Sequence, residues 1–155
     1  MSVEARLAEL GITLPEVAAP VAAYQPAVRS GNHVYTAGQL PFVDGALPVT
    51  GKVGDGEGLV DPAMAAELAR TCALNALAAV RSVAGTLDGV RIVKVTGFVA
   101  SDPAFTGQPA VLNGASTVLG EIFGDVGTHA RSAVGVAVLP LDSPVEVELI
   151  AELIA

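Results

Sequence analysis

The chain has 155 residues, a length that fits one domain with a core of its own. Because 52% of its residues are hydrophobic and only 15% are charged, it has more apolar surface than a small globule usually hides, and we expect its subunits to associate. Sixteen acidic residues against eight basic ones give a net charge of −8, which repels phosphate groups and disfavours non-specific binding of nucleic acid.

The first 18 residues read as an extension of a single domain that spans residues 1–155. The segment Ser2 to Leu10 favours a short helix, with Ser2 as its N-cap and Gly11 after its end. The N-terminus lacks the basic and apolar regions of a secretory signal, and no stretch approaches the roughly 18–20 apolar residues of a membrane span. We therefore expect a cytoplasmic protein without membrane contact, whose single cysteine, Cys72, lies in a helix core.

Two short strands and a glycine-rich loop come next. The segments Ala27–Arg29 and His33–Ala37 flank a Ser-Gly-Asn turn, and this pattern favours a β-hairpin. The loop from Pro41 to Val60 contains many glycines but lacks the Gly-Lys-Ser/Thr end of a phosphate loop. We expect this loop to be a flexible connector.

The rest of the chain alternates helices and strands. A helix begins at Asp61-Pro62 and runs to Ala84, a strand covers Val90–Ala100, and a second helix spans about Pro109 to Phe123. The segments Arg131–Val138 and Val145–Ile154 follow, and we expect these two strands to pair as a hairpin. The order predicts an α+β fold, in which one mixed sheet carries two helices on one face and something else covers the other face.

Strand alternation divides the segment that begins at Arg131 into two faces. One face carries valines, which we expect under the helices, and the other carries Arg131 beside small residues. In the expected hairpin, Glu146 and Glu148 share the face of Arg131. The valines are Val134, Val136 and Val138, and the small residues are Ala133, Gly135 and Ala137.

Arg131 is therefore the leading candidate for a ligand-binding residue. A guanidinium with free space above it suits a small carboxylate ligand, because its planar donors match a carboxylate with two parallel bonds. The alternative is a structural ion pair between Arg131 and Glu146 or Glu148, across strands or across subunits. Spacing in the sequence leaves both possibilities open.

Other chemistries have weaker support. His33 and His129 lie far apart in the sequence and belong to no zinc-binding pattern, so we expect no metal site. Neither histidine accompanies a Gly-x-Ser-x-Gly motif. His129 reads as a surface residue, or alternatively as part of a pocket entrance.

A series of short motifs extends from about Ala19 to the C-terminus. They are Thr36-Ala37-Gly38-Gln39-Leu40-Pro41, the strand Ile92–Val99, Asn113 in the second helix, Ala130-Arg131-Ser132-Ala133-Val134, Leu139-Pro140 and Val145-Glu146-Val147-Glu148-Leu149-Ile150-Ala151, with Tyr24 upstream of Gly38. In order and spacing they resemble the motifs of the RidA/YjgF family, also called endoribonuclease L-PSP.

The resemblance implies a chorismate-mutase-like fold that assembles as a homotrimer, with ligand sites between subunits. Catalytic members hydrolyse enamine or imine intermediates of amino-acid metabolism to 2-oxo acids and ammonia, without a cofactor or a metal. By resemblance, the catalytic residues are Arg131, which holds the substrate carboxylate, and Glu146, which polarises or positions a water. The positions that match substrate-binding residues of the family are Tyr24, Gly38, Asn113 and Ala133.

The chain also departs from the family pattern. Ala37 stands where many members have Ser, and Ala133 stands where many have Cys, so the expected site lacks a hydroxyl and a thiol. His129 replaces a residue that is usually Pro. These differences and the N-terminal extension indicate a divergent branch. They leave open a non-catalytic trimer that binds small carboxylates or acts like a chaperone. An endoribonuclease is less favoured, because the chain is acidic.

Overall fold

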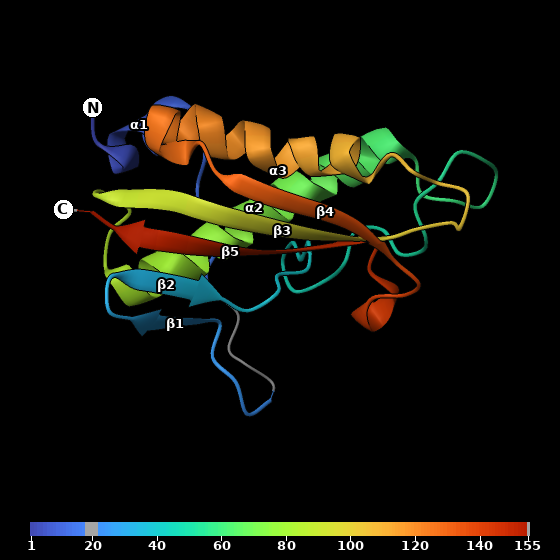
Figure 1. Ribbon diagram of the computed structural model, residues 1–155, viewed down its shortest axis with the longest axis horizontal. Helices are drawn as coiled ribbons and strands as arrows, with labels where there is room; N and C mark the ends of the chain where they lie inside the picture. The colour runs from blue at the N-terminus through green and yellow to red at the C-terminus, as the bar shows by residue number, and fades with distance from the viewer. Residues whose placement is uncertain (18–21, 155) are drawn as a thin grey trace.

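The computed structural model describes residues 1–17 and 22–154. A five-stranded sheet carries two long helices along one face, and a short N-terminal helix lies at one end of the helical layer (Figure 1). These elements confirm the expected α+β fold, and each expected boundary lies within two residues of the observed one. In chain order they are α1 (Val3–Glu9), β1 (Ala27–Ser30), β2 (His33–Thr36), α2 (Pro62–Ala84), β3 (Val90–Ala100), α3 (Gln108–Phe123), η1 (Gly124–Gly127), β4 (Ala130–Val136), η2 (Pro140–Asp142) and β5 (Val145–Leu153).

The sheet is mixed, with the strand order β1-β2-β5-β3-β4. β4 pairs with β3 in parallel, whereas the other neighbouring strands are antiparallel. The expectation that the last two strands form a hairpin is therefore wrong. Because α3 crosses over the sheet between β3 and β4, the chain returns parallel to β3 at the sheet edge. The last strand, β5, then enters on the other side of β3, next to β2.

The two faces of β4 are the reverse of those expected. Arg131 is paired with Val95, which is fully buried beneath the helices. Glu146 is paired with Phe98, whose side chain points to the opposite face of β3. We call these the covered face and the open face of the sheet. Arg131 lies on the covered face, and Glu146 lies on the open face.

Small residues lie beneath α3 because this helix approaches the sheet closely. A Cβ atom at Gly97 would overlap the side chain of Leu112, and one at Gly135 would lie 2.8 Å from Gln108 Nε2. Ala133 also packs against the hydrophobic core. The small side chains make room for the helix. The size of the side chains was therefore a misleading guide to which face of β4 is buried.

Large apolar side chains remain exposed on the open face. Val28 is 54% exposed, Tyr35 is 45% exposed and Val134 is 43% exposed. Their strands extend across the sheet from one edge to the other, and α2 and α3 both lie on the opposite side (Figure 1). Part of the apolar excess of the composition therefore reaches the exterior on this surface.

Helix α2 forms the middle of the core. The carboxylate of Asp61 accepts a hydrogen bond from Ala63 N at 2.8 Å, and Gly85 ends the helix with φ 84°, a conformation that favours glycine. The helix is long and apolar enough to cross a membrane by length and composition, contrary to the expectation that no stretch approaches a membrane span. Cys72 and Leu77 of this helix are nevertheless fully buried within the domain, whereas Met64 in its first turn is 46% exposed.

The glycine-rich loop is more ordered than expected. Val53 is fully buried, and its N–H donates to the Ala100 carbonyl at 2.7 Å at the end of β3. The Gly54 N–H donates to the Val60 carbonyl at 3.2 Å, which closes the loop on itself. The middle of the expected flexible connector is therefore fixed to the sheet.

Candidate functional site

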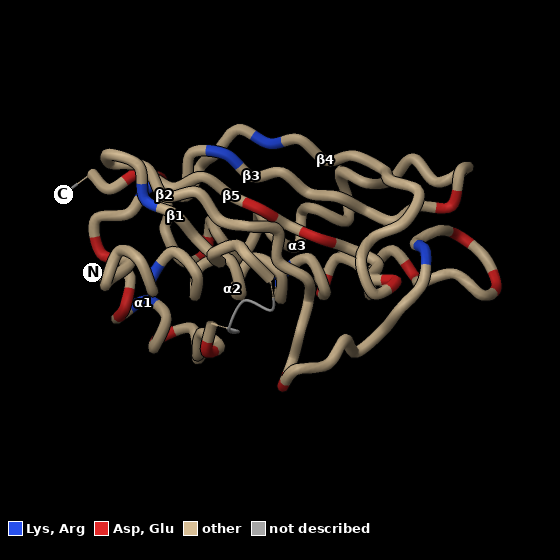
Figure 2. The backbone as a smooth tube through the Cα atoms, turned by 90° about the horizontal axis from the view of Figure 1, so that it is seen from below, with Lys and Arg blue, Asp and Glu red and all other residues tan. Residues whose placement is uncertain are grey.

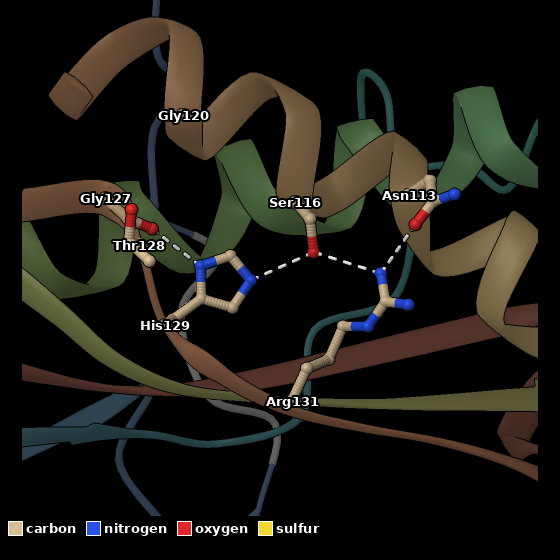
Figure 3. A pocket seen from close by; sticks show the side chains of 7 residues that line it. All are labelled: Asn113, Ser116, Gly120, Gly127, Thr128, His129 and Arg131. Carbon is tan, nitrogen blue, oxygen red and sulfur yellow. Dashed lines mark hydrogen bonds between the residues drawn. The ribbon is translucent and has the colours of Figure 1, made fainter. Parts of the chain in front are cut away.

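Arg131 belongs to a polar cluster between β4 and α3 (Figure 3). Its Nη1 donates to Asn113 Oδ1 at 2.9 Å and to Ser116 Oγ at 3.1 Å, and its Nη2 donates to the Pro109 carbonyl at 3.3 Å. Asn113 and Ser116 are three residues apart on α3, so both lie on one side of the helix. Neutral acceptors of one helix thus hold the guanidinium.

Two donors of Arg131 remain for a ligand. A guanidinium has five N–H groups, and the three bonds above use both on Nη1 and one on Nη2. Within residues 1–17 and 22–154, no carboxylate side chain forms a salt bridge with Arg131. The structural ion pair with Glu146 or Glu148 is therefore not formed within the chain, and the free Nε and Nη2 donors suit a carboxylate from elsewhere.

The cluster continues through Ser116 to His129. His129 Nε2 lies 2.9 Å from Ser116 Oγ, and His129 Nδ1 lies 2.6 Å from the Gly127 carbonyl. A carbonyl oxygen can only accept, so Nδ1 carries the proton and, in the neutral ring, Nε2 accepts from the Ser116 hydroxyl. Of the two positions considered for His129, the structure supports the pocket.

These residues surround an open cavity of about 360 Å³ beside the guanidinium. The cavity contains no purely apolar side chain and no carboxylate. Its lining consists of Asn113, Ser116, Gly120, Gly127, Thr128, His129 and Arg131, as Figure 3 shows. We call Arg131, Asn113, Ser116 and His129 the covered-face group.

A second polar group lies on the open face, where the end of β2 meets β5. A Cβ atom at Gly38 would overlap Glu146 Oε1, so the missing side chain lets the carboxylate lie against the backbone. Gln39 and Val147 exchange two backbone hydrogen bonds, at 2.8 and 3.0 Å, which fix this contact. We call Gly38 and Glu146 the open-face group.

The environment of Glu146 favours its protonated form. Burial raises the pKa of the Glu146 carboxyl above its usual 4.5, and the nearby charge of Glu148 raises the pKa further. Glu146 and Glu148 both lie on β5, and their pairing with Phe98 and Thr96 places both on the open face. Figure 2 shows acidic positions along the backbone of β5 in red. A carboxyl of this kind can both accept and return a proton closer to neutral pH than an ordinary glutamate.

The loop after Gly38 is fastened to the helical layer. Asn75 Nδ2, on α2, donates to the Leu40 carbonyl at 2.9 Å and to the Phe42 carbonyl at 3.2 Å. Thr36, which is almost fully buried, accepts a hydrogen bond from Leu149 N at 3.0 Å. The backbone around Gly38 is thus held from both sides.

The site residues expected from the sequence therefore fall into two groups in one chain. The structure brings Arg131 and Asn113 together, and it brings Gly38 and Glu146 together, but the sheet lies between the two groups. Tyr24 is 53% exposed before β1, at the sheet edge opposite β4. Ala133 packs against the core beneath α3 and does not line the cavity.

Ser116 was not among the site residues expected from the sequence. It lies three residues after Asn113 on α3, and His129 lies two residues before Arg131, immediately before β4 begins, so each pair lies on one side of its segment. These two spacings are the signal that could have placed all four residues in one cluster. These spacings indicate a cluster only when it is known that β4 lies beside α3.

Comparison with known proteins agrees with this fold. The family model described as "YjgF/chorismate_mutase-like, putative endoribonuclease" matches residues 4–153. The chain belongs to this family. The match confirms the resemblance seen in the motifs, and it includes α1 and the glycine-rich loop as well as the sheet and the long helices.

Three known proteins are similar to the chain over most of its length. The crystal structure of Atu1372 from Agrobacterium tumefaciens, a protein of unknown function, is 45% identical with a TM-score of 0.87, and the alignment covers 97% of this chain and 92% of that one. Protein TCP17 of Trypanosoma cruzi is 44% identical over 97% of this chain and 94% of its own. E. coli TdcF, solved with bound serine, is 26% identical with a TM-score of 0.66, over 88% of this chain and 93% of that one.

Proposed function

We propose that the protein hydrolyses reactive enamine or imine intermediates of amino-acid metabolism to 2-oxo acids and ammonia. The observation that carries the proposal is Arg131, whose guanidinium is held by α3, has no carboxylate partner in the described residues and keeps two donors free. A 2-imino acid has a carboxylate directly beside its reacting carbon. Anchoring that carboxylate therefore fixes the position of the carbon.

Glu146 is the proposed proton carrier. Its raised pKa suits a group that takes a proton from the attacking water and returns it to the departing nitrogen. Within the described residues, the Gly38 N–H beside it has no hydrogen-bond acceptor, which leaves a donor for the ligand. The reaction uses no metal or cofactor. The imine is already unstable in water, so positioning and one acid–base group are sufficient chemistry.

The two groups meet only between subunits in this proposal. Because Arg131 and Glu146 lie on opposite faces of the sheet, a complete site requires the open face of one subunit beside the β4 edge of another. The exposed apolar residues of the open face support such packing. The homotrimer implied by the family resemblance would form three equivalent sites, with Tyr24 brought in from the same neighbouring subunit.

The size and charge of the cavity suit an amino-acid-sized ligand. It holds one guanidinium and no carboxylate, although the protein as a whole is strongly acidic. The more distantly similar TdcF was solved with bound serine, which carries the same carboxylate group as the proposed substrates. Nucleic acid is an unsuitable partner, because the net charge of −8 repels it.

A coupled assay tests the reaction. An amino-acid oxidase or dehydratase generates imines with different side chains, and the release of 2-oxo acid is followed with the wild type and with Arg131→Ala. We expect the wild type to accelerate release for at least one side chain and Arg131→Ala to lose the acceleration. Equal rates with and without wild-type protein for all side chains would remove the deaminase proposal.

Mixed assemblies test the sharing of the site. Arg131→Ala and Glu146→Gln subunits are each inactive by the proposal, and they are dissociated, mixed and reassembled. In a random mixture, roughly one quarter of the interfaces combine an intact Arg131 with an intact Glu146. We expect activity to return to about that fraction. Persistent inactivity, with assembly verified by light scattering, would contradict a site shared between subunits.

The alternative is a trimer that binds small carboxylates without turnover. The observation that favours it is the separation of the two groups: the covered-face group alone can hold a carboxylate, whether or not Glu146 reaches it. Saturable binding of 2-oxo acids that is lost in Arg131→Ala, without any acceleration of imine hydrolysis, would select this function. The cytoplasmic location expected from the sequence stays a prediction.

A further inference from the structure

The pair formed by Ser116 and His129 has no part in the imine hydrolysis described above, which needs only Arg131, Glu146 and water. The two side chains are hydrogen-bonded at 2.9 Å at the wall of the cavity, and both are half-buried. We propose that Ser116 and His129 form a nucleophile–base pair, and that the cavity beside Arg131 hydrolyses small carboxylic esters as a second activity.

The orientation of His129 suits a general base. The Gly127 carbonyl, 2.6 Å from Nδ1, fixes the proton on that nitrogen and turns the Nε2 lone pair toward Ser116 Oγ. A serine becomes nucleophilic when a neighbouring base can take its proton, and a third group that orients the base completes the arrangement. Here a backbone carbonyl takes the place that a carboxylate has in other serine hydrolases.

Arg131 supplies the positive charge that the reaction requires. Its Nη1 lies 3.1 Å from Ser116 Oγ and donates to it, which favours the ionised oxygen. The carbonyl oxygen of an ester attacked by Oγ would lie close to this guanidinium. Donors held at the position where negative charge develops are a major source of catalysis, because they need not reorganise during the reaction.

The cavity admits a small acyl group. Its volume of about 360 Å³ falls in the lower part of the range of small-molecule sites, about 300–1,000 Å³. Gly120 lines it, and a Cβ atom there would meet nothing within 4 Å. The wall of the cavity at Gly120 is thus open. The absence of a carboxylate from the lining favours a ligand in which an oxygen becomes negative.

The reaction balances with water as the only co-reactant. Ser116 Oγ forms a bond to the ester carbon while its proton moves to His129 Nε2, and the carbonyl electron pair moves to the oxygen beside Arg131. Collapse of this intermediate breaks the bond to the alcohol oxygen, which takes the proton from His129. Water then attacks the acyl-serine through the same base, and the carboxylic acid and free Ser116 are released.

Covalent labelling gives the most direct test. The assembled wild-type protein is treated with a small fluorophosphonate, which phosphonylates serines that a neighbouring base activates. We expect one adduct per chain by intact mass, mapped to Ser116 by peptide analysis, and no adduct in His129→Gln. Ser82→Ala is the matched control. Ser82 is also a helical serine whose hydroxyl is hydrogen-bonded, in this case to the Ala79 carbonyl, but it lies on α2 and does not line the cavity. It should label like the wild type.

Ester hydrolysis separates catalysis from a purely structural role of the pair. With p-nitrophenyl acetate, we expect His129→Gln to lower kcat by about 100-fold, the usual contribution of a general base. Calorimetric binding of 2-oxo acids by His129→Gln, measured in parallel, distinguishes loss of the base from loss of the Arg131 position, and 2-oxo acids should inhibit the wild type competitively. Absence of a Ser116 adduct in the wild type, or ester hydrolysis that His129→Gln leaves unchanged, would overturn the proposal. The pair would then serve only to hold Arg131.

Discussion

The covered and open faces of the sheet carry two different ionisable groups of the candidate site. On the covered face, a cation is held by neutral acceptors from α3. On the open face, a carboxyl lies against the backbone of Gly38, and its pKa is raised by burial. Because the sheet separates them, neither charge neutralises the other within one chain. In the proposed assembly, both groups therefore stay available for a ligand, at a site that a second subunit completes.

The largest expected effect is that of Arg131→Ala. It removes the carboxylate anchor of the covered face, and we expect a loss of imine hydrolysis of about 100-fold or more, since misplacement of a bound reactant by about 1 Å already costs that much. Arg131→Lys should recover little, because an ammonium cannot offer paired planar donors. Ammonia release and calorimetric binding of 2-oxo acids measure the effect. Arg29→Ala, an exposed arginine on β1, is the control.

Val134→Lys tests the open face. A charge placed among its exposed apolar side chains should weaken subunit contact, so the mass measured by light scattering should fall and imine hydrolysis should fall with it. The chain itself should stay folded by circular dichroism. Met64→Lys makes the same change on α2 at similar exposure, 46% against 43%, and should leave the mass unaltered. If both variants keep the wild-type mass, the open face is not the interface.

Gly97→Ala tests the packing of the covered face. The added methyl group overlaps Leu112, so we expect a loss of stability of about 1–3 kcal/mol, as for other overpacked cores. Gly120→Ala adds the same group where nothing lies within 4 Å, and it should stabilise α3 by up to about 1 kcal/mol. Chemical denaturation of both variants gives the comparison. Equal stabilities would mean that α3 does not press on the sheet at this point.

Glu146→Gln gives the smallest effect on stability. The folded protein binds the Glu146 proton more tightly than the unfolded chain, so this carboxyl contributes stability at acid pH that is lost as the pH rises through its raised pKa. Glutamine removes this loss. We expect Tm to rise by about 2 °C or less at neutral pH, because the group is only partly buried, and the difference to vanish at acid pH. A difference independent of pH would argue against the raised pKa.

The sequence was sufficient to predict each α-helix and strand, although not the 3-10 helices η1 and η2, because caps, glycine stops and alternation are local signals. Arg131 and Asn113 could also be predicted to share a site, and so could Gly38 and Glu146, from the family motifs. The strands that pair with each other in the sheet could not be predicted from the sequence. Alternation assigns side chains to two faces without saying which face is covered, and the small residues Ala133 and Gly135 lie beneath a helix that comes unusually close. The link from Ser116 to His129 depends on that same approach of α3.

The central position of β5 in the sheet also bears on the order in which the two polar groups form during folding. Arg131 and its partners all lie in the continuous β3-α3-β4 unit, whose contacts are near in sequence and can form early. Gly38 and Glu146 come from opposite ends of the chain, and they meet only when the last strand inserts between β2 and β3. We therefore expect the Arg131 cluster to form before Glu146 reaches Gly38.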